Sequence, residues 1–382
     1  MKLIPHISRP LVLALGLALG SVCAPAFAQK VVKIGVGGPY TGGAAAYGKD
    51  FESAVKLAID DANAAGIKLG GEAVRFELLS EDDAGDPKQA VSVATRLVDQ
   101  KVAGVVGHLQ SGATIPASKV YHDAGIPQVA PAATNPTFTR QSFKTAFRVI
   151  GDDLQVGSAM AGYIVTKLGF KSVAVIDDRT AFGKGLADVV ASTVPTLGGK
   201  VAAREFTTDK ATDFKAILTS IKAKNVQAIF YGGLNAQAGP LKRQMKDLGI
   251  NATLFGSSIS SDEFVSFAGK EAAEGTISAD SGQAIENMPG GPDFVKKFTA
   301  KYGPVVMYAP YGYDATNVLI NAMKAANSPD PKKYLPEIAK LNFKGVTGPI
   351  AFDSKGDLRS AAVTFFRVKG GKWETLETVS TK

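Results

Sequence analysis

The chain has 382 residues, with 43 Lys and Arg against 35 Asp and Glu, and Cys23 is its single cysteine. One cysteine excludes an internal disulfide and any metal site built from several thiolates. The basic residues are scattered among acidic ones and form no run with interleaved aromatics, so the composition gives no indication of nucleic acid as a partner. The length exceeds that of one ordinary core, and we expect two domains.

The first 28 residues have the pattern of a secretory signal peptide. Lys2 and Arg9 accompany the apolar stretch LVLALGLALG at 11–20, which is too short to span a membrane. The segment Ala26-Phe27-Ala28 is a small-x-small cleavage signal. We therefore expect export to the periplasm with cleavage after Ala28, which leaves a mature chain without cysteine.

From Val31 to about residue 150, short apolar strands alternate with amphipathic helices, which predicts a parallel sheet built from βαβ units. The strand segments are KIGVGG, RFELLSED, AGVVG at 103–107 and PQVAP. The helices are expected at 48–65, at 87–100 with Asp86 as N-cap, and at 112–124 with Ser111 as N-cap. In the first of them the apolar residues Phe51, Val55, Ala58 and Ile59 recur at helical spacing, which predicts its buried face.

The same pattern restarts after FRVIG at 147–151. Helices are expected at 155–168, 184–197, 213–224 and 237–248, among the strands SVAVIDD, KVAAREF, QAIFYGG and ATLFGSS. The tail adds a helix after Pro292, another at 313–327, and a closing strand pair around PIAFD and AVTFFRV. The fold class is therefore α/β, with two Rossmann-like lobes of parallel sheet and a ligand cleft between them. Lobe 1 is expected to comprise 29–149 and 281–352, and lobe 2 to comprise 150–280 and 353–382.

Two turns of the first lobe carry a hydroxyl at the point where a buried strand stops. AGVVG leads to Ser111, and PQVAP leads to Thr134 in AATNP. The carboxyl ends of neighbouring parallel strands meet at one edge of a sheet, where such folds bind ligands. Ser111 would lie beside the free amide N–H groups at the start of a helix. The two turns together predict a site for an anion, such as a carboxylate, that needs no arginine.

Other candidate chemistry fits its required spacing less well. In IGVGGPYTGG a dinucleotide fingerprint fails, because Tyr40 stands where the third glycine belongs. His108 lies close to Ser111 and suggests a hydrolase, but GHLQSGA lacks the G-x-S-x-G motif, which favours a structural histidine. Asp152 and Asp153 precede a helix; capping is the favoured role, although either could line the cleft.

The second lobe offers aromatic and polar side chains in the loops that follow its strands. Phe182 lies in DDRTAFGKG, Asn235 in YGGLNAQ, and Ser257 and Ser258 follow ATLFG. In the first lobe, Tyr47 ends a Gly/Ala-rich loop and is expected to form a pocket wall. These positions predict a ring of polar and aromatic groups around one cleft.

The segments GHLQSGATIPAS, APAATNP, DDAGDPKQAV, YGG before a helix, and TGPIAFDSKGDL resemble the leucine/isoleucine/valine-binding group of type I periplasmic binding proteins. The similarity runs in the same order over nearly all of the chain after the signal. It implies two lobes joined by a three-strand hinge that close on a ligand. It also implies a non-catalytic solute-binding component of an ABC importer that delivers its ligand to an inner-membrane permease. We expect no cofactor and no metal, and a monomer is the simplest form for delivery by diffusion. The alternatives are a ligand sensor of the same fold and an exported serine hydrolase.

The resemblance extends to site residues. The family's carboxylate-binding serine and threonine match Ser111 and Thr134, with the turn at Ala132 beside them, and aromatics that cover the ligand match Tyr47 and Phe182. The expected ligand-binding set is Tyr47, Ser111, Ala132, Ala133, Thr134, Phe182, Asn235 and Ser258.

Two departures from the family bear on the ligand. Some members have a disulfide, but the two matching positions in this chain are Gly85 and Gln110, so that constraint is absent. The acidic residue that holds a ligand ammonium is replaced in the loop of Ser257 and Ser258, and the Asp of the YGG turn is Asn235. Because a buried, unpaired ammonium is costly, these changes favour a small carboxylate with an apolar or aromatic body. A branched-chain amino acid is the close alternative, with Asp152 or Asp153 as the source of negative charge.

Overall fold

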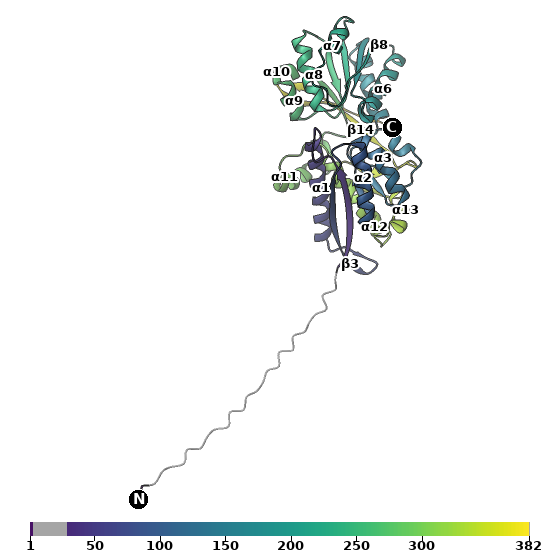
Figure 1. Ribbon diagram of the computed structural model, residues 1–382, viewed down its shortest axis with the longest axis vertical. Coiled ribbons are helices and arrows are strands. Elements are labelled where there is room, and N and C mark those ends of the chain that lie inside the picture. The colour runs from purple at the N-terminus through teal and green to yellow at the C-terminus, as the bar shows by residue number, and fades with distance from the viewer. Residues whose placement is uncertain (3–28, 382) are drawn as a thin grey trace.

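The computed structural model describes residues 1–2 and 29–381, so the expected signal peptide and its cleavage point lie almost entirely outside the described residues. Two α/β lobes lie one above the other along the long axis of the molecule (Figure 1). This arrangement confirms the predicted fold class. No helix among the described residues is long and apolar enough to cross a membrane.

The first lobe is built on a six-stranded sheet in the order β2-β3-β1-β4-β5-β6. All neighbours are parallel except the edge strand β2, which is antiparallel to β3. The strands are β1 (Lys30–Gly38), β2 (Lys68–Leu69), β3 (Glu72–Asp82), β4 (Gly104–Gly107), β5 (Gln128–Ala130) and β6 (Ala146–Arg148).

Helices cover this sheet and bury the faces that the sequence pattern predicts. Phe51, Val55, Ala58 and Ile59 of α1 are at most 4% exposed, and a fully buried side chain of this kind contributes about 1.5–3 kcal/mol. Asp86 caps α2, since its carboxylate accepts from the next free N–H groups. The helices of this lobe are α1 (Ala45–Ala64), α2 (Pro87–Asp99), α3 (Ser111–Asp123), α4 (Thr137–Arg140), α11 (Gly291–Tyr302), α12 (Ala309–Ala325) and α13 (Pro331–Ile338). A short hairpin of β12 (Asn342–Lys344) and β13 (Pro349–Ala351) and a 3₁₀ turn at Ile285–Asn287 belong to the same part of the chain.

The second lobe has a seven-stranded sheet in the order β15-β14-β11-β10-β9-β7-β8. Its strands are β7 (Ser172–Asp177), β8 (Lys200–Phe206), β9 (Ala228–Gly232), β10 (Thr253–Gly256), β11 (Ile277–Ser281), β14 (Ala361–Lys369) and β15 (Lys372–Thr381). Its helices are α5 (Asp153–Gly162), which continues as a π-helical turn to Lys167, α6 (Ala181–Thr196), α7 (Lys215–Lys222), α8 (Asn235–Asp247), α9 (Asp262–Ala268) and α10 (Lys270–Ala273). The first five strands in sequence are parallel, and β14 and β15 are antiparallel additions at one edge.

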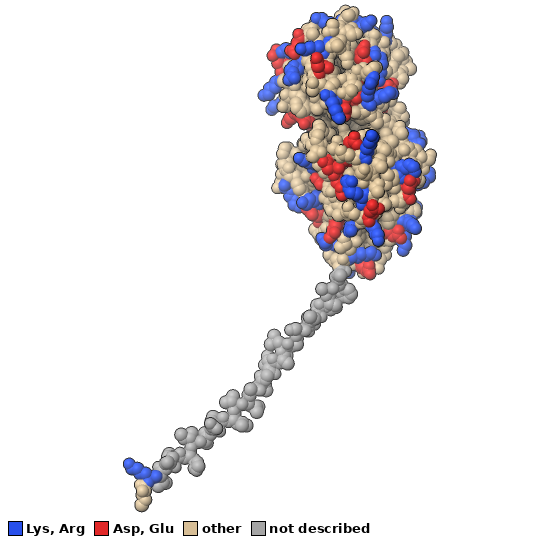
Figure 2. All heavy atoms as spheres, viewed as in Figure 1, with Lys and Arg blue, Asp and Glu red and all other residues tan. Residues whose placement is uncertain are grey.

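The chain passes between the lobes three times, after β6, after β11 and before β14 (Figure 1). The crossing segments are joined to one another: Arg148 N–H donates to Gly356 O over 3.0 Å, and Gly151 N–H donates to Ser281 Oγ over 2.8 Å. The lobe boundaries expected at 149/150, 280/281 and 352/353 remain a prediction. On the face shown in Figure 2, basic and acidic side chains are interspersed over both lobes, as the sequence indicates.

Several details of the predicted secondary structure are wrong. Phe182 and Asn235 lie in the first turns of α6 and α8 and not in the loops before these helices. Ser111 is the first residue of α3 and not its N-cap; Gln110 holds the cap position without a side-chain bond. The expected pairing of PIAFD with AVTFFRV does not form, because β13 pairs with β12 while β14 lies between β11 and β15. The final hairpin completes the second sheet, whereas β13 remains with the first lobe.

Candidate functional site

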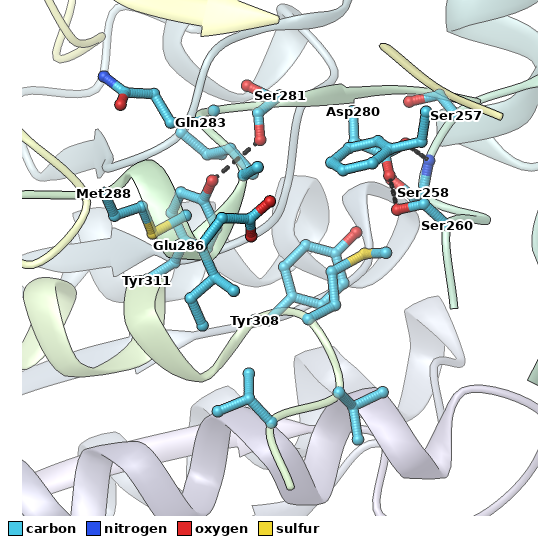
Figure 3. A pocket seen from close by; sticks show the side chains of 18 of the residues that line it. Ser257, Ser258, Ser260, Asp280, Ser281, Gln283, Glu286, Met288, Tyr308 and Tyr311 are labelled. Carbon is cyan, nitrogen blue, oxygen red and sulfur yellow. Dashed lines mark hydrogen bonds between the residues drawn. The ribbon is translucent and has the colours of Figure 1, made fainter. Parts of the chain in front are cut away.

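Two cavities meet near the crossing segments. The inter-lobe cavity, of about 510 Å³, lies between the strand-end loops of the two lobes. The hinge-side cavity, of about 390 Å³, lies beside the loop that follows β11 and the start of α12. Ser258 and Tyr308 line both cavities, so these side chains stand at the boundary between them. Figure 3 shows the hinge-side cavity with Tyr308 at its centre.

The predicted carboxylate residues lie at the edge where β4 and β5 end. Ser111 lines the inter-lobe cavity and Thr134 lines the hinge-side cavity. The Ser111 hydroxyl accepts the Asn135 N–H over 3.2 Å, a bond that ties the two turns together. The Thr134 hydroxyl is buried and has no hydrogen-bond partner among the described residues. With the free N–H groups of the first turn of α3, these hydroxyls suit a carboxylate at the junction of the two cavities.

Asp152 and Asp153, adjacent in sequence, have different roles. The Asp152 carboxylate accepts the N–H groups of Leu154 and Gln155, each over 3.1 Å, and the Gln155 side chain completes a capping box for α5. The capping role is therefore confirmed for Asp152. Asp153 is left in the first turn of the same helix without a capping function.

The Asp153 carboxyl is buried beside Thr134. Asp153 N–H donates to Thr134 O over 2.9 Å, and neither carboxyl oxygen has a hydrogen bond of ordinary geometry within the described part of the chain. Burial raises the pKa of Asp153 to about 7, with the Thr134 hydroxyl and the Arg148 charge opposing the shift. A buried carboxyl without a partner is costly, so this position favours a ligand group that donates hydrogen bonds or carries positive charge.

Arg148 holds the turn that carries Thr134. Its side chain is fully buried, and its Nη1 donates to the carbonyl oxygens of Ala133 over 2.7 Å and Asn135 over 3.2 Å. These are the residues on either side of Thr134. Asp357 balances the charge by accepting from Arg148 Nε over 2.6 Å. The sequence reasoning did not identify this support, because nothing in the segment FRVIG distinguishes a buried arginine from a surface one.

Tyr47 connects the lobes at the cavity wall. Its ring belongs to α1 of the first lobe, and its hydroxyl donates to Ser258 O of the second lobe over 3.1 Å. The Asn235 side-chain amide donates to the same hydroxyl and, over 2.7 Å, to Ser261 Oγ. Asn235 therefore fixes the position of the Tyr47 hydroxyl by a hydrogen bond.

The histidine that suggested a hydrolase is a structural residue. His108 is fully buried; its Nδ1 lies 2.6 Å from Asp83 Oδ2 and its Nε2 lies 3.0 Å from Tyr121 Oη. Both ring nitrogens are thus occupied, and Ser111 bonds to Asn135 instead. The geometry contains no Ser111–His108 pair that could activate a nucleophile.

The structure brings most of the predicted residues to the cavities. Those that line the inter-lobe cavity are Tyr47, Ser111, Ala132, Phe182 and Ser258, and Thr134 lines the other. Ala133 and Asn235 line neither: Ala133 is buried in a core cluster with Phe138, and Asn235 bonds to the Tyr47 hydroxyl. Asp152 and Asp153 are likewise not among the described lining residues of either cavity; Asp153 lies buried next to Thr134, which is one. Sequence reasoning missed Tyr308 and Asp280, which line the hinge-side cavity. The available signals were an aromatic residue just before a helix in MYAPYGY and an acidic residue at the end of the strand segment ISADS.

Two α/β lobes, three crossings and a cavity between strand ends define a protein that closes on a small molecule. The chain belongs to the periplasmic binding protein family, whose model matches residues 31–372. It is therefore a periplasmic solute-binding protein.

Individual relatives agree with this assignment. The chain is 38% identical over 330 residues to an amino acid binding protein of Pseudomonas aeruginosa, with 86% of this chain and 87% of the relative covered. It is 36% identical to Leu/Ile/Val-binding protein homolog 1 of Brucella suis, with 94% and 95% covered. Among solved structures it is similar to the leucine-binding protein LivK of Thermotoga maritima, with a TM-score of 0.84, 29% identity, and 91% and 98% covered. It is also similar to the branched-chain amino acid transporter protein LivJ of Streptococcus pneumoniae in complex with isoleucine, with a TM-score of 0.81, 29% identity, and 92% and 100% covered.

Replacing Tyr47 by phenylalanine is expected to weaken ligand binding about tenfold. The ring would stay, but the inter-lobe hydrogen bonds of its hydroxyl with Ser258 O and the Asn235 amide would be lost, and one such bond contributes about 0.5–1.5 kcal/mol. Calorimetric titration with an amino acid that the protein binds measures the change in affinity. Tyr121→Phe is the matched control, because it removes a buried tyrosine hydroxyl that bonds within one lobe. Equal loss of affinity in both variants would contradict an inter-lobe role for Tyr47.

Proposed function

We propose that this protein captures an α-amino acid with an apolar body between its lobes and delivers it to the permease of an inner-membrane ABC importer. The ligand carboxylate binds at Ser111, Thr134 and the first N–H groups of α3. Its ammonium faces Asp153. The observation that carries the proposal is the buried Asp153 carboxyl next to the Thr134 hydroxyl, neither of which has a hydrogen bond of ordinary geometry among the described residues.

The position of Asp153 changes the ligand class that the sequence favours. Replacement of the family's acidic residue by Ser257 and Ser258 favours a carboxylate ligand without an ammonium. The buried Asp153 supplies a negative charge at the carboxylate end of the site, so an ammonium need not be left unpaired. The names of the relatives, which include amino acid and Leu/Ile/Val-binding proteins, support the same ligand class.

Titration of ligand-stripped protein with leucine, phenylalanine and their keto acids tests the proposal. Leucine is expected to bind at least tenfold more tightly than its keto acid. Asp153→Asn should lower leucine affinity at least tenfold, because removing one partner of a buried charge pair costs about 2–5 kcal/mol. The same variant should not lower keto-acid affinity, because the keto acid has no ammonium and its carboxylate is repelled by the Asp153 charge.

Asp123→Asn is the control for a lost carboxylate, since Asp123 is an exposed residue of the first lobe that pairs with Lys119. Both ligands should bind this variant as they bind the parent. A parent protein that prefers the keto acid would contradict the amino-acid proposal and return the ligand to the class of simple carboxylates.

Delivery to a permease requires that the protein act without chemistry on its ligand. We infer a monomer that binds and releases the amino acid unchanged, with the closed form recognised by the permease. The unchanged ligand should be recovered from the protein by mass spectrometry. Cleavage after Ala28 belongs to the same proposal, and N-terminal sequencing of the periplasmic protein should begin at Gln29.

A further inference from the structure

The hinge-side cavity is apolar on most of its wall and acidic where it is charged. Its apolar lining includes Ile150, Val156, Ile285, Met288 and Phe366. The charged side chains that line it are Asp280 and Glu286, and no Lys or Arg is among its described lining residues. The volume, about 390 Å³, is within the range of about 300–1,000 Å³ typical of ligand pockets.

Asp280 brings a buried carboxyl to this cavity. Its carboxylate accepts the Ser258 N–H over 2.6 Å, the Ser278 hydroxyl over 2.6 Å and the Ser260 hydroxyl. These three contacts reach both oxygens of the carboxyl, and burial raises its pKa, a shift that a nearby positive charge would oppose. Asp280 has no salt bridge within the described residues. Figure 3 shows the carboxylate next to Ser258 and Ser260, with Tyr308 nearby.

The inter-lobe cavity has a different charge balance. Asp178 and Asp209 line it, but Arg179 lines it as well. A positively charged ligand group therefore meets a like charge in the inter-lobe cavity and none in the hinge-side cavity. This difference decides which compartment suits a cation.

The boundary between the cavities is held by buried carboxylates. Asp50 of α1 accepts four backbone N–H groups at 2.7–2.9 Å, including that of Tyr308, and so fixes the loop that presents Tyr308. On the opposite side, Asp280 fixes Ser258. Thr134, the predicted carboxylate residue, opens into the hinge-side cavity with an unpaired hydroxyl. A ligand whose head lies at Thr134 is therefore already at the edge of the hinge-side cavity, beside Tyr308.

We propose that the hinge-side cavity is a second compartment of the ligand site, and that it takes the far end of an amino-acid side chain whose apolar stem ends in a positively charged N–H group. The apolar wall receives the stem, and Asp280 receives the charge. This inference rests on the proposed function for the head of the ligand. It goes beyond the proposed function because it predicts that lysine- or arginine-like side chains bind more tightly than apolar side chains of similar length.

The test compares lysine and arginine with norleucine, which has the same stem as lysine and no end charge. Calorimetric titration of the full-length mature protein should give at least tenfold tighter binding for lysine or arginine than for norleucine. The two cationic ligands distinguish an ammonium from a guanidinium end. Asp280→Asn should remove the difference from norleucine, while asparagine keeps an acceptor for the Ser258 N–H.

Asp178→Asn is the matched control, because it removes a buried, hydroxyl-bonded carboxyl from the inter-lobe cavity. It should leave the preference for lysine unchanged. Val295→Phe fills the hinge-side cavity from α11 and should weaken lysine binding at least tenfold while leaving alanine binding within twofold.

Three results would overturn the second compartment: equal binding of lysine and norleucine, loss of the preference in Asp178→Asn, or unchanged lysine binding in Val295→Phe. Failure of the proposed function is a separate outcome, since it would appear as keto acids binding more tightly than amino acids. Leucine that binds through Asp153 without any preference for lysine over norleucine would keep the proposed function and reject this inference.

Discussion

Replacing Arg148 by methionine is expected to lower the free energy of unfolding by about 3–5 kcal/mol, because it removes the fully buried cation of Asp357 and leaves that carboxylate with the partly exposed Arg140 alone. The variant also leaves the carbonyl oxygens of Ala133 and Asn135 without their donor. Because these carbonyls flank Thr134, the turn that binds the carboxylate loses its support, and ligand affinity should fall with stability. Urea denaturation of the ligand-free protein measures the first effect, and titration with a bound amino acid measures the second.

Arg140→Met is the matched control within the same network. Arg140 also bonds to Asp357 and reaches Asp152 over 3.0 Å, but its side chain is 32% exposed and contacts neither carbonyl beside Thr134. A partly exposed ion pair contributes less, so we expect a loss of roughly 1–2 kcal/mol and nearly unchanged affinity. Equal losses of stability in the two variants would show that burial of Arg148 is not what makes it important.

The local pattern of the sequence predicted the parts of the fold that depend on neighbouring residues. Alternating strands and helices predicted both lobes, and the spacing of Phe51, Val55 and Ile59 predicted the buried face of α1. Asp86 and Asp152 are caps, as their places before helices indicate. The meeting of the Ser111 and Thr134 turns followed from the rule that parallel strands end at one edge.

The remaining features depend on contacts between distant segments. The last strand of the chain, β15, pairs with β14 and completes the second sheet, while β13 stays with the first lobe. Asp50 and Tyr308, which are held together at the cavity boundary, come from widely separated parts of the sequence. No spacing rule connects such residues. The different environments of Asp152 and Asp153 likewise arise from the direction in which α5 leaves the crossing segment.

Binding of an amino acid is expected to weaken about tenfold when the pH falls from 8 to 6, whereas binding of the matching keto acid should not weaken. Burial raises the pKa of Asp153 to about 7 in the free protein. An ammonium needs the ionised carboxylate, so each pH unit below 7 costs up to tenfold in affinity. A keto acid gains nothing from that charge. Titrations at half-unit intervals of pH with leucine and its keto acid would measure both profiles.

Stability of the ligand-free protein should change in the opposite direction. Because the folded pKa of Asp153 lies above its ordinary value of 3.8, the stabilisation from the neutral carboxyl is complete below about pH 4 and is lost as pH rises to about 7. The difference of about three pKa units corresponds to about 4 kcal/mol. Asp153→Asn should remove this step and the pH dependence of leucine binding together.

Asp178→Asn separates the pH dependence of stability due to Asp153 from that due to a second buried carboxyl. Burial raises the pKa of Asp178 to about 6, with its Thr180 hydrogen bonds opposing the shift. Asp178→Asn should therefore leave unchanged the loss of stability that ends near pH 7. Leucine binding that stays constant from pH 8 to 6 in the parent protein would show that Asp153 does not hold the ammonium, and the charge would then have to come from a carboxyl that lines one of the cavities, such as Asp280 or Asp178.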